Sequence, residues 1–195
     1  MADEPRLDRR EAVARLLRDR GDLLVVAGLG SATYDCAAAG DDPRNFYLWG
    51  AMGGTAAMAL GLAQAQPERP VAAITGDGDM LMGLGSLATI GAAAPANLSV
   101  VVLDNEVYGE TGAQPTATAR GVSLSEVARG CGIEAMDDIR DMNALATLAT
   151  RLQLREGPLF ANIKITTDEH PRVLPARDGA YLRARFREAV LGTGP

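Results

Sequence analysis

The chain has 195 residues, of which 47% are hydrophobic and 23% are charged, so it can bury the core of one compact domain. Its 25 acidic residues outnumber its 19 basic ones, and a net charge of −6 argues against a nucleic-acid-binding protein. The two cysteines, Cys36 and Cys131, lie far apart and form no CxxC motif. This spacing disfavours a zinc or iron–sulfur site.

The N-terminal segment 1–10 is charged and lacks the apolar stretch of a signal peptide. No apolar run elsewhere is long enough to cross a bilayer. We therefore expect a cytoplasmic protein with reduced thiols and with neither a membrane nor a nucleic acid as its partner.

Hydrophobic periodicity predicts helices and strands in alternation. In chain order we expect a helix opened by Pro5 and ended by Gly21, a strand at 23–27, a helix at 53–65, a strand at 71–75, a glycine-interrupted helix at 80–93, a strand at 98–103, a helix begun by the capping box 123–126, a helix at 143–154, a strand at 159–165 and a helix capped by Asp178. This order indicates one domain over 1–195 with a doubly wound α/β fold. It should have about six mostly parallel strands with helices on both faces.

Polar residues follow two of the predicted strands. Gly76-Asp77-Gly78 ends one strand, and Asp104-Asn105 ends the next. Parallel strands end at the same edge of a sheet, so Asp77 and Asn105 should lie near each other there. Their carboxylate and amide oxygens suit Mg²⁺. The flanking glycines allow close approach of a diphosphate, which the N-terminus of the following helix would attract.

These two motifs resemble those of thiamine-diphosphate enzymes. The surrounding segments 50–53, 83–90, 95–98, 104–109 and 111–116 are similar to the β subunit of sulfopyruvate decarboxylase and to the C-terminal half of phosphonopyruvate decarboxylase. The resemblance covers roughly residues 25–175 and is most specific between 45 and 120.

The resemblance implies roles for individual residues. Asp77 and Asn105 match the side-chain Mg²⁺ ligands, and Val107 matches the residue that donates a backbone carbonyl. The backbone of Gly76, Gly78, Asp79 and Met80 matches the turn that holds the diphosphate, and that of Gly50 and Ala51 matches contacts to the aminopyrimidine. Met52 matches the residue that bends the cofactor beneath the thiazolium ring, although methionine is also a common core residue. Tyr108 and Gln114 either line the substrate side of that ring or hold the loop, and Tyr108 and Gly109 are also expected to contact the cofactor.

Two positions depart from the decarboxylase pattern. Asp79 adds a carboxylate that should repel a diphosphate unless it is turned away, and Glu110 replaces a smaller polar residue. Asp79 also increases the resemblance to the β subunit of 2-oxo acid:ferredoxin oxidoreductases. Those subunits generally carry cluster-binding cysteines, so we rank that alternative second. A cofactor-binding module without catalysis is a third interpretation.

The resemblance implies a small 2-oxo acid substrate and a decarboxylase with thiamine diphosphate and Mg²⁺ as cofactors. The family's catalytic glutamate belongs to a pyrimidine-binding domain, and no glutamate of this sequence has a matching context. We therefore expect a hetero-oligomer in which a partner subunit supplies that glutamate. The chain alone should be inactive, and self-association is also expected.

Overall fold

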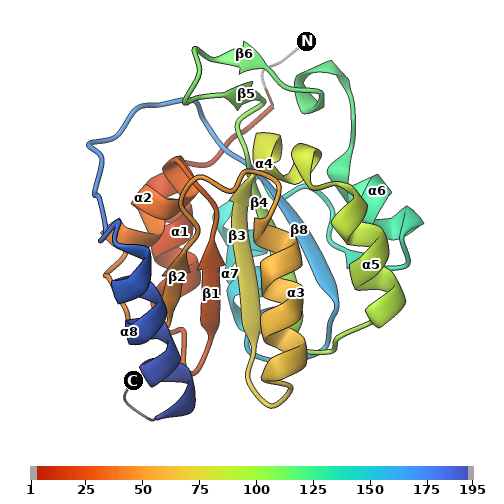
Figure 1. Ribbon diagram of the computed structural model, residues 1–195. Coiled ribbons are helices and arrows are strands. Elements are labelled where there is room, and N and C mark those ends of the chain that lie inside the picture. Colours follow the sequence, from red (N-terminus) through yellow and green to blue (C-terminus); the bar gives the residue numbers. More distant parts are fainter. Residues whose placement is uncertain (1–3, 193–195) are drawn as a thin grey trace.

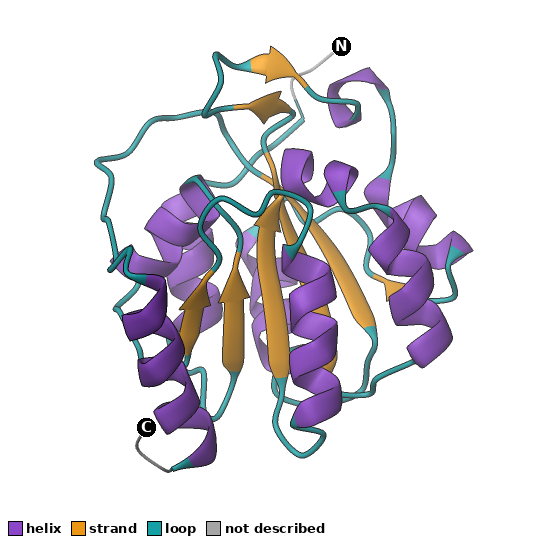
Figure 2. Ribbon diagram, viewed as in Figure 1, coloured by secondary structure: helices purple, strands orange, loops and turns teal. Residues whose placement is uncertain are grey.

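The computed structural model describes residues 4–192 and contains a parallel six-stranded sheet with helices on both faces (Figures 1 and 2). The strand order is β2-β1-β3-β4-β8-β7. The strands of this sheet are β1 (Leu24–Ala27), β2 (Asn45–Tyr47), β3 (Val71–Gly76), β4 (Leu98–Asp104), β7 (Glu134–Ala135) and β8 (Leu159–Lys164). The predicted doubly wound α/β fold is confirmed.

The helices and a small hairpin complete the chain. The α-helices are α1 (Arg9–Leu17), α2 (Ser31–Ala38), α3 (Thr55–Ala65), α4 (Asp77–Met82), α5 (Gly85–Ala93), α6 (Leu124–Gly130), α7 (Met142–Arg151) and α8 (Gly179–Leu191). The hairpin strands are β5 (Val107–Tyr108) and β6 (Gln114–Pro115), followed by the 3-10 helix η1 (Thr118–Arg120). Between residues 4 and 192, no helix combines the length and apolar character needed to span a membrane.

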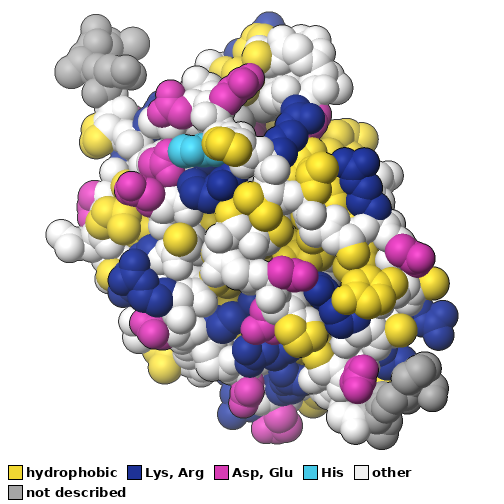
Figure 3. Space-filling view, turned by 90° about the vertical axis from the view of Figure 1, so that its left-hand side faces the viewer, with side chains coloured by type: hydrophobic (Ala, Val, Ile, Leu, Met, Phe, Trp, Pro, Cys, Tyr) yellow, Lys and Arg dark blue, Asp and Glu magenta, His cyan; other side chains and the backbone are white. Residues whose placement is uncertain are grey.

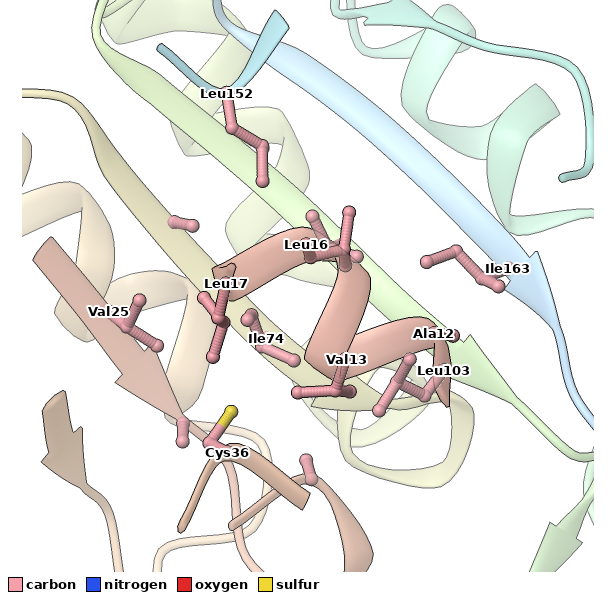
Figure 4. Close-up of a cluster of buried hydrophobic side chains, with 14 of the residues drawn as sticks. Ala12, Val13, Leu16, Leu17, Val25, Cys36, Ile74, Leu103, Leu152 and Ile163 are labelled. Carbon is pink, nitrogen blue, oxygen red and sulfur yellow. The ribbon is translucent and has the colours of Figure 1, made fainter. Parts of the chain in front are cut away.

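Side chains that alternate along the strands pack into two hydrophobic cores, one on each face of the sheet. In β4, Val101 and Leu103 pack with α1, α2 and α7, whereas Val100 and Val102 pack with α3, α5 and α6 on the opposite face. Figure 4 shows the first core, in which α1 crosses the sheet over Ile74 and Leu103. Both faces of the sheet are therefore covered, and its functional groups must project from its ends.

Helix α1 begins at Arg9, four residues after the predicted start at Pro5. Asp8 caps it by accepting a hydrogen bond from the backbone N–H of Glu11, at 2.8 Å. Leu7 instead pairs with the sheet, because its N–H donates to the carbonyl of Lys164 and its carbonyl accepts from Thr166, both at 2.9 Å. The N-terminal segment thus extends the sheet before it turns into the helix.

The glycine-interrupted helix predicted over 80–93 is two helices, α4 and α5. The first begins at Asp77, directly after β3. The break falls at Gly83, where a Cβ atom would lie 2.2 Å from the carbonyl oxygen of Gly53. Because the loop before α3 contacts the backbone here, the chain needs a glycine at this turn.

The register of the two central strands positions the carboxyl-end loops. β3 and β4 are parallel neighbours, and Gly76 pairs with Leu103. The next residues, Asp77 and Asp104, therefore emerge together from the sheet. The hairpin β5–β6 follows β4 and rises above this edge (Figure 1).

Candidate active site

Two buried carboxylates, Asp77 and Asp104, lie at the ends of β3 and β4 with 1% and 0% of their surfaces exposed. Two threonine hydroxyls connect them. Thr116 Oγ1 lies 2.6 Å from Asp77 Oδ2, and Thr118 Oγ1 lies 3.2 Å from the same oxygen and 2.9 Å from Asp104 Oδ1. The two acidic groups thus belong to one hydrogen-bonded cluster.

Among residues 4–192, a cationic side chain pairs with only one of these carboxylates. Lys164 Nζ lies 2.7 Å from Asp104 Oδ2, and Asn162 Nδ2 donates to the same oxygen at 3.0 Å. The hydrogen bonds described for the Asp77 side chain come from neutral hydroxyls. Burial therefore raises the pKa of Asp77 to about 6, and the Asp104 carboxylate contributes to the rise. Such a buried carboxylate favours a bound cation.

Asp79, two residues further along α4, faces away from Asp77. Its carboxylate accepts hydrogen bonds from the backbone N–H of Gly53, from the Thr55 hydroxyl at 2.6 Å and from the Thr75 hydroxyl. A Cβ at Gly28 would lie 2.5 Å from Asp79 Oδ2, so the end of β1 also packs against this group. The turned-away geometry that would remove repulsion from a diphosphate is thus present.

We expect Asp79→Asn to destabilise the fold without removing metal affinity. An amide offers a single acceptor oxygen and turns an N–H₂ group toward donors, so the free energy of unfolding should fall by about 2–3 kcal/mol. Urea denaturation and Mn²⁺ titration of the same preparation measure the two effects. Unchanged stability with weakened Mn²⁺ binding would instead place Asp79 in the metal site.

Three predicted site residues converge over the turn after β3. A Cβ at Gly78 would lie 2.6 Å from Tyr108 Cε1 and 3.4 Å from Met52 Cε. The Tyr108 ring and the Met52 methyl group therefore lie directly above Gly78, where a larger residue would displace them. Met52 is 37% exposed, which does not fit the alternative that it is an ordinary core residue.

The loop that carries Met52 presents its backbone to the same edge. Gly50 and Gly53 have φ angles of +70° and +87°, conformations that glycine adopts without strain. Gly50 and Ala51 are exposed. Nothing lies within 4 Å of a Cβ built at Gly50, so a ligand has access to this backbone.

Most of the other predicted residues lie in the hairpin β5–β6 or in the segment that joins β4 to it. Asn105 Oδ1 accepts from the Val107 N–H at 3.0 Å, and Val107 pairs with Pro115 in the hairpin. Gln114 is exposed and forms two 2.9 Å hydrogen bonds with Thr111, which supports its loop-holding interpretation. Gly109 is exposed at the tip.

Met80 is the exception among the residues near the diphosphate turn, because its side chain is 2% exposed and belongs to the core. Only its backbone could therefore contribute to a ligand site. The prediction of a main-chain contact to the diphosphate by Met80, and by Gly76 at the end of β3, stays a prediction.

The donor set at this edge fits a magnesium ion. It comprises the Asp77 carboxylate, the Asn105 amide oxygen and the backbone carbonyl of Val107, all hard oxygen ligands. A magnesium ion usually also binds substrate or cofactor phosphates, which the backbone of the turn at Gly78 is predicted to hold.

The interpretation of the sequence missed three residues of the cluster. Thr116 is the last residue of the matched segment 111–116 and Thr118 lies two positions beyond it, and nothing in their spacing indicates a contact with a carboxylate. Lys164 is the only lysine of the chain and lies in the last strand of the predicted sheet, beside β4. The presence of the only lysine in a predicted buried strand was the one feature of the sequence that could have pointed to Lys164.

Comparisons with known proteins identify the family to which the chain belongs. The family model described as thiamine pyrophosphate enzyme, C-terminal TPP binding domain, matches residues 29–163. Sulfopyruvate decarboxylase subunit beta of Methanothermobacter thermautotrophicus is 38% identical and aligns with 95% of this chain and 97% of its own length. Phosphonopyruvate decarboxylase of Streptomyces viridochromogenes is 40% identical over 93% of this chain, which spans only 47% of that relative.

A solved structure shares the fold. A Mycobacterium smegmatis chain assigned as a thiamin diphosphate-dependent enzyme aligns with a TM-score of 0.70 and 23% identity, over 83% of this chain and 32% of that one. The family match covers well over half of the sequence and includes every motif at the carboxyl end of the sheet. This chain therefore belongs to the thiamine pyrophosphate enzyme family and carries its C-terminal TPP-binding domain.

Proposed function

We propose that this chain is the thiamine-diphosphate- and Mg²⁺-binding subunit of a heteromeric decarboxylase acting on a small 2-oxo acid of the sulfopyruvate or phosphonopyruvate type. The observation that carries the proposal is Asp77, a buried carboxylate beside the turn at Gly78 that has no cationic partner among the described residues. The curated relatives, which are named as decarboxylases of these two acids, support the reaction class.

In this proposal the residues of the chain bind and orient the cofactor. Asp77, Asn105 and the Val107 carbonyl hold Mg²⁺, and the backbone at Gly76–Met80 holds the diphosphate. Met52 supports the thiazolium ring, and the exposed backbone at Gly50 and Ala51 contacts the aminopyrimidine. Bound thiamine diphosphate supplies the electron sink for loss of CO₂ from a 2-oxo acid. Tyr108 would shield that centre from water.

The two glutamates of the hairpin region, Glu106 and Glu110, already contact cationic side chains of the chain. Glu106 pairs with Arg6 at 2.6 Å and with Lys164 at 2.9 Å, and these cations lower its pKa. Glu110 reaches Gly30 and lies 3.6 Å from Arg172. Neither glutamate is free to act on the aminopyrimidine. We therefore assign the catalytic glutamate to the pyrimidine-binding domain of a partner subunit.

One face of the molecule suits that partner. Segments 50–67 and 80–103, which include α3 and α5, contain no charged residue, and Met52, Met58 and Met82 are exposed along them. By contrast, the face formed by α2, α8 and the segment before α8 carries many charged side chains (Figure 3). An uncharged surface beside the site is typical of a subunit interface. The partner should cover this surface.

We expect Met58→Arg to weaken association with the partner subunit by at least about 100-fold, because the interface would have to bury an unpaired charge. Met58 is 40% exposed on the outer side of α3. Met142→Arg is the matched control, since Met142 is 44% exposed on α7, behind the sheet. Analytical ultracentrifugation of the mixed subunits measures both. Equal effects of the two substitutions would contradict this placement of the partner.

Reconstitution tests the function itself. The chain is purified from its host with the subunit that accompanies it, and CO₂ release from sulfopyruvate, phosphonopyruvate and pyruvate is measured with thiamine diphosphate and Mg²⁺. Activity should require both subunits and both cofactors. Decarboxylation by the chain alone would refute the partner assignment. A partner that carries an iron–sulfur cluster, together with ferredoxin-linked oxidation of the 2-oxo acid, would refute the assignment as a decarboxylase.

A further inference from the structure

We propose that Thr116 and Thr118 are positioning residues that orient Asp77 for the metal and connect the hairpin β5–β6 to it. This inference rests on the metal site proposed above. Both threonine side chains are buried, with 1% and 5% of their surfaces exposed, and neither lies in a regular strand or α-helix. Buried hydroxyls in a loop are held by specific partners, and here the partners are the two carboxylates.

The donor and the acceptor can be assigned in the shortest of the hydrogen bonds between the threonines and the carboxylates. A hydroxyl has one proton, and the shortest contact, 2.6 Å from Thr116 Oγ1 to Asp77 Oδ2, assigns the Thr116 proton to Asp77. Thr118 Oγ1 lies 2.8 Å from Thr116 Oγ1 and 2.9 Å from Asp104 Oδ1, so it can donate to either. Both hydroxyls approach Asp77 at Oδ2. Among the described residues no side chain donates to the other carboxylate oxygen, Oδ1, so this is the oxygen that a cation would bind.

Thr116 also holds the base of the hairpin β5–β6 through its backbone. The Thr116 N–H donates to the carbonyl of Glu106 at 2.9 Å, which closes the hairpin at its base. Tyr108, whose ring lies over Gly78, belongs to this hairpin. A rotation of Asp77 away from Thr116 would therefore loosen the segment that carries Tyr108, and binding of a cation at Oδ1 should tighten it.

Removing one hydroxyl tests this role. The full chain, with thiamine diphosphate present, is titrated with Mn²⁺ and free Mn²⁺ is followed by electron paramagnetic resonance. Thr116→Val keeps the shape of the side chain and should weaken Mn²⁺ binding by about 10- to 100-fold, as loss of an outer partner of a metal ligand does. Thr116→Ser keeps the hydroxyl and should bind like the wild type. Thr111→Val removes an exposed hydroxyl from the same hairpin and serves as the control.

The outcomes separate this inference from the proposed function. A wild-type chain that binds no Mn²⁺ overturns both. A wild-type chain that binds Mn²⁺, with Thr116→Val binding equally well, overturns the positioning role alone. Recovery in Thr116→Ser assigns the effect to the hydroxyl, and urea denaturation confirms that each variant is folded. If Thr116→Val does not fold, Thr118→Val gives the same test from the second hydroxyl.

Discussion

Replacing Asp77 by asparagine should lower the Mg²⁺-dependent affinity for thiamine diphosphate by more than about 100-fold, because removing a metal ligand should cost more than removing one of its outer partners. Asp77 is the buried carboxylate of the cluster that has no cation from the described part of the chain. Trp49, the only tryptophan, immediately precedes Gly50, so its fluorescence can report cofactor binding. Retained Mg²⁺-dependent affinity would show that the ligand assignment is wrong.

The same substitution should stabilise the protein in the absence of metal. Burial raises the pKa of Asp77 to about 6, which means that the fold disfavours the charged form near neutral pH. Asparagine removes that cost, and the free energy of unfolding without metal should rise by about 1–3 kcal/mol. If the variant gains stability and loses cofactor binding, the Asp77 carboxylate serves function and not the stability of the fold. Asp79→Asn, on the same helix, should show the opposite pair of effects.

The central strands were predictable because their physical signals are local. β3 and β4 are continuous apolar runs bounded by glycine and acidic residues, a pattern typical of parallel strands buried on both faces. Their predicted ends lie within one residue of those observed. The position of Asp77 at the edge of the sheet followed from this register, without knowledge of any side-chain contact.

Elements defined by distant contacts were not predictable. β2 is three residues long and pairs only with β1, and α8 packs beside it through an edge-to-face contact between the rings of Phe46 and Phe186, whose centroids are 5.5 Å apart. Helix α2 begins at Ser31 after Gly30 without a side-chain cap, so the usual start signal is missing. In both cases the deciding interactions join segments far apart in the sequence.

In the site, too, the residues of the motif were predictable, whereas the contacts made by the surrounding residues were not. The motif located Asp77, Gly78 and Asn105, but the side-chain direction of Asp79 depends on Gly53, Thr55 and Thr75, which no spacing rule connects to it. Charge compensation is equally non-local, because Lys164 reaches Asp104 from a strand 60 residues later. A motif therefore identifies ligands, whereas the fold decides which carboxylates remain without a cation.

Replacing Lys164 by methionine should lower the free energy of unfolding by about 3–5 kcal/mol, the usual cost of removing one partner of a buried ion pair. Lys164 is 6% exposed, and its ammonium group bridges Asp104 and Glu106. Without it, Asp104 keeps Asn162 and Thr118 as neutral donors and becomes a second buried charge beside Asp77. Urea denaturation in the absence of metal measures the loss. Arg155→Met, which breaks an exposed pair with Glu68, is the control and should cost less than about 1 kcal/mol.

A second substitution and the pH dependence test whether charge causes the loss. Asp104→Asn in the Lys164→Met background removes the unpaired carboxylate and should recover part of the stability. Burial opposes the charge of Lys164, but its two carboxylate partners outweigh that effect and raise its pKa above 10.5. The contribution of Lys164 is therefore complete below pH 10.5 and is lost as the pH rises through the higher folded-state pKa. A Lys164→Met variant as stable as the wild type would mean that the buried pair of Lys164 and Asp104 contributes no net stability, and the contrast between a compensated Asp104 and an uncompensated Asp77 would no longer hold.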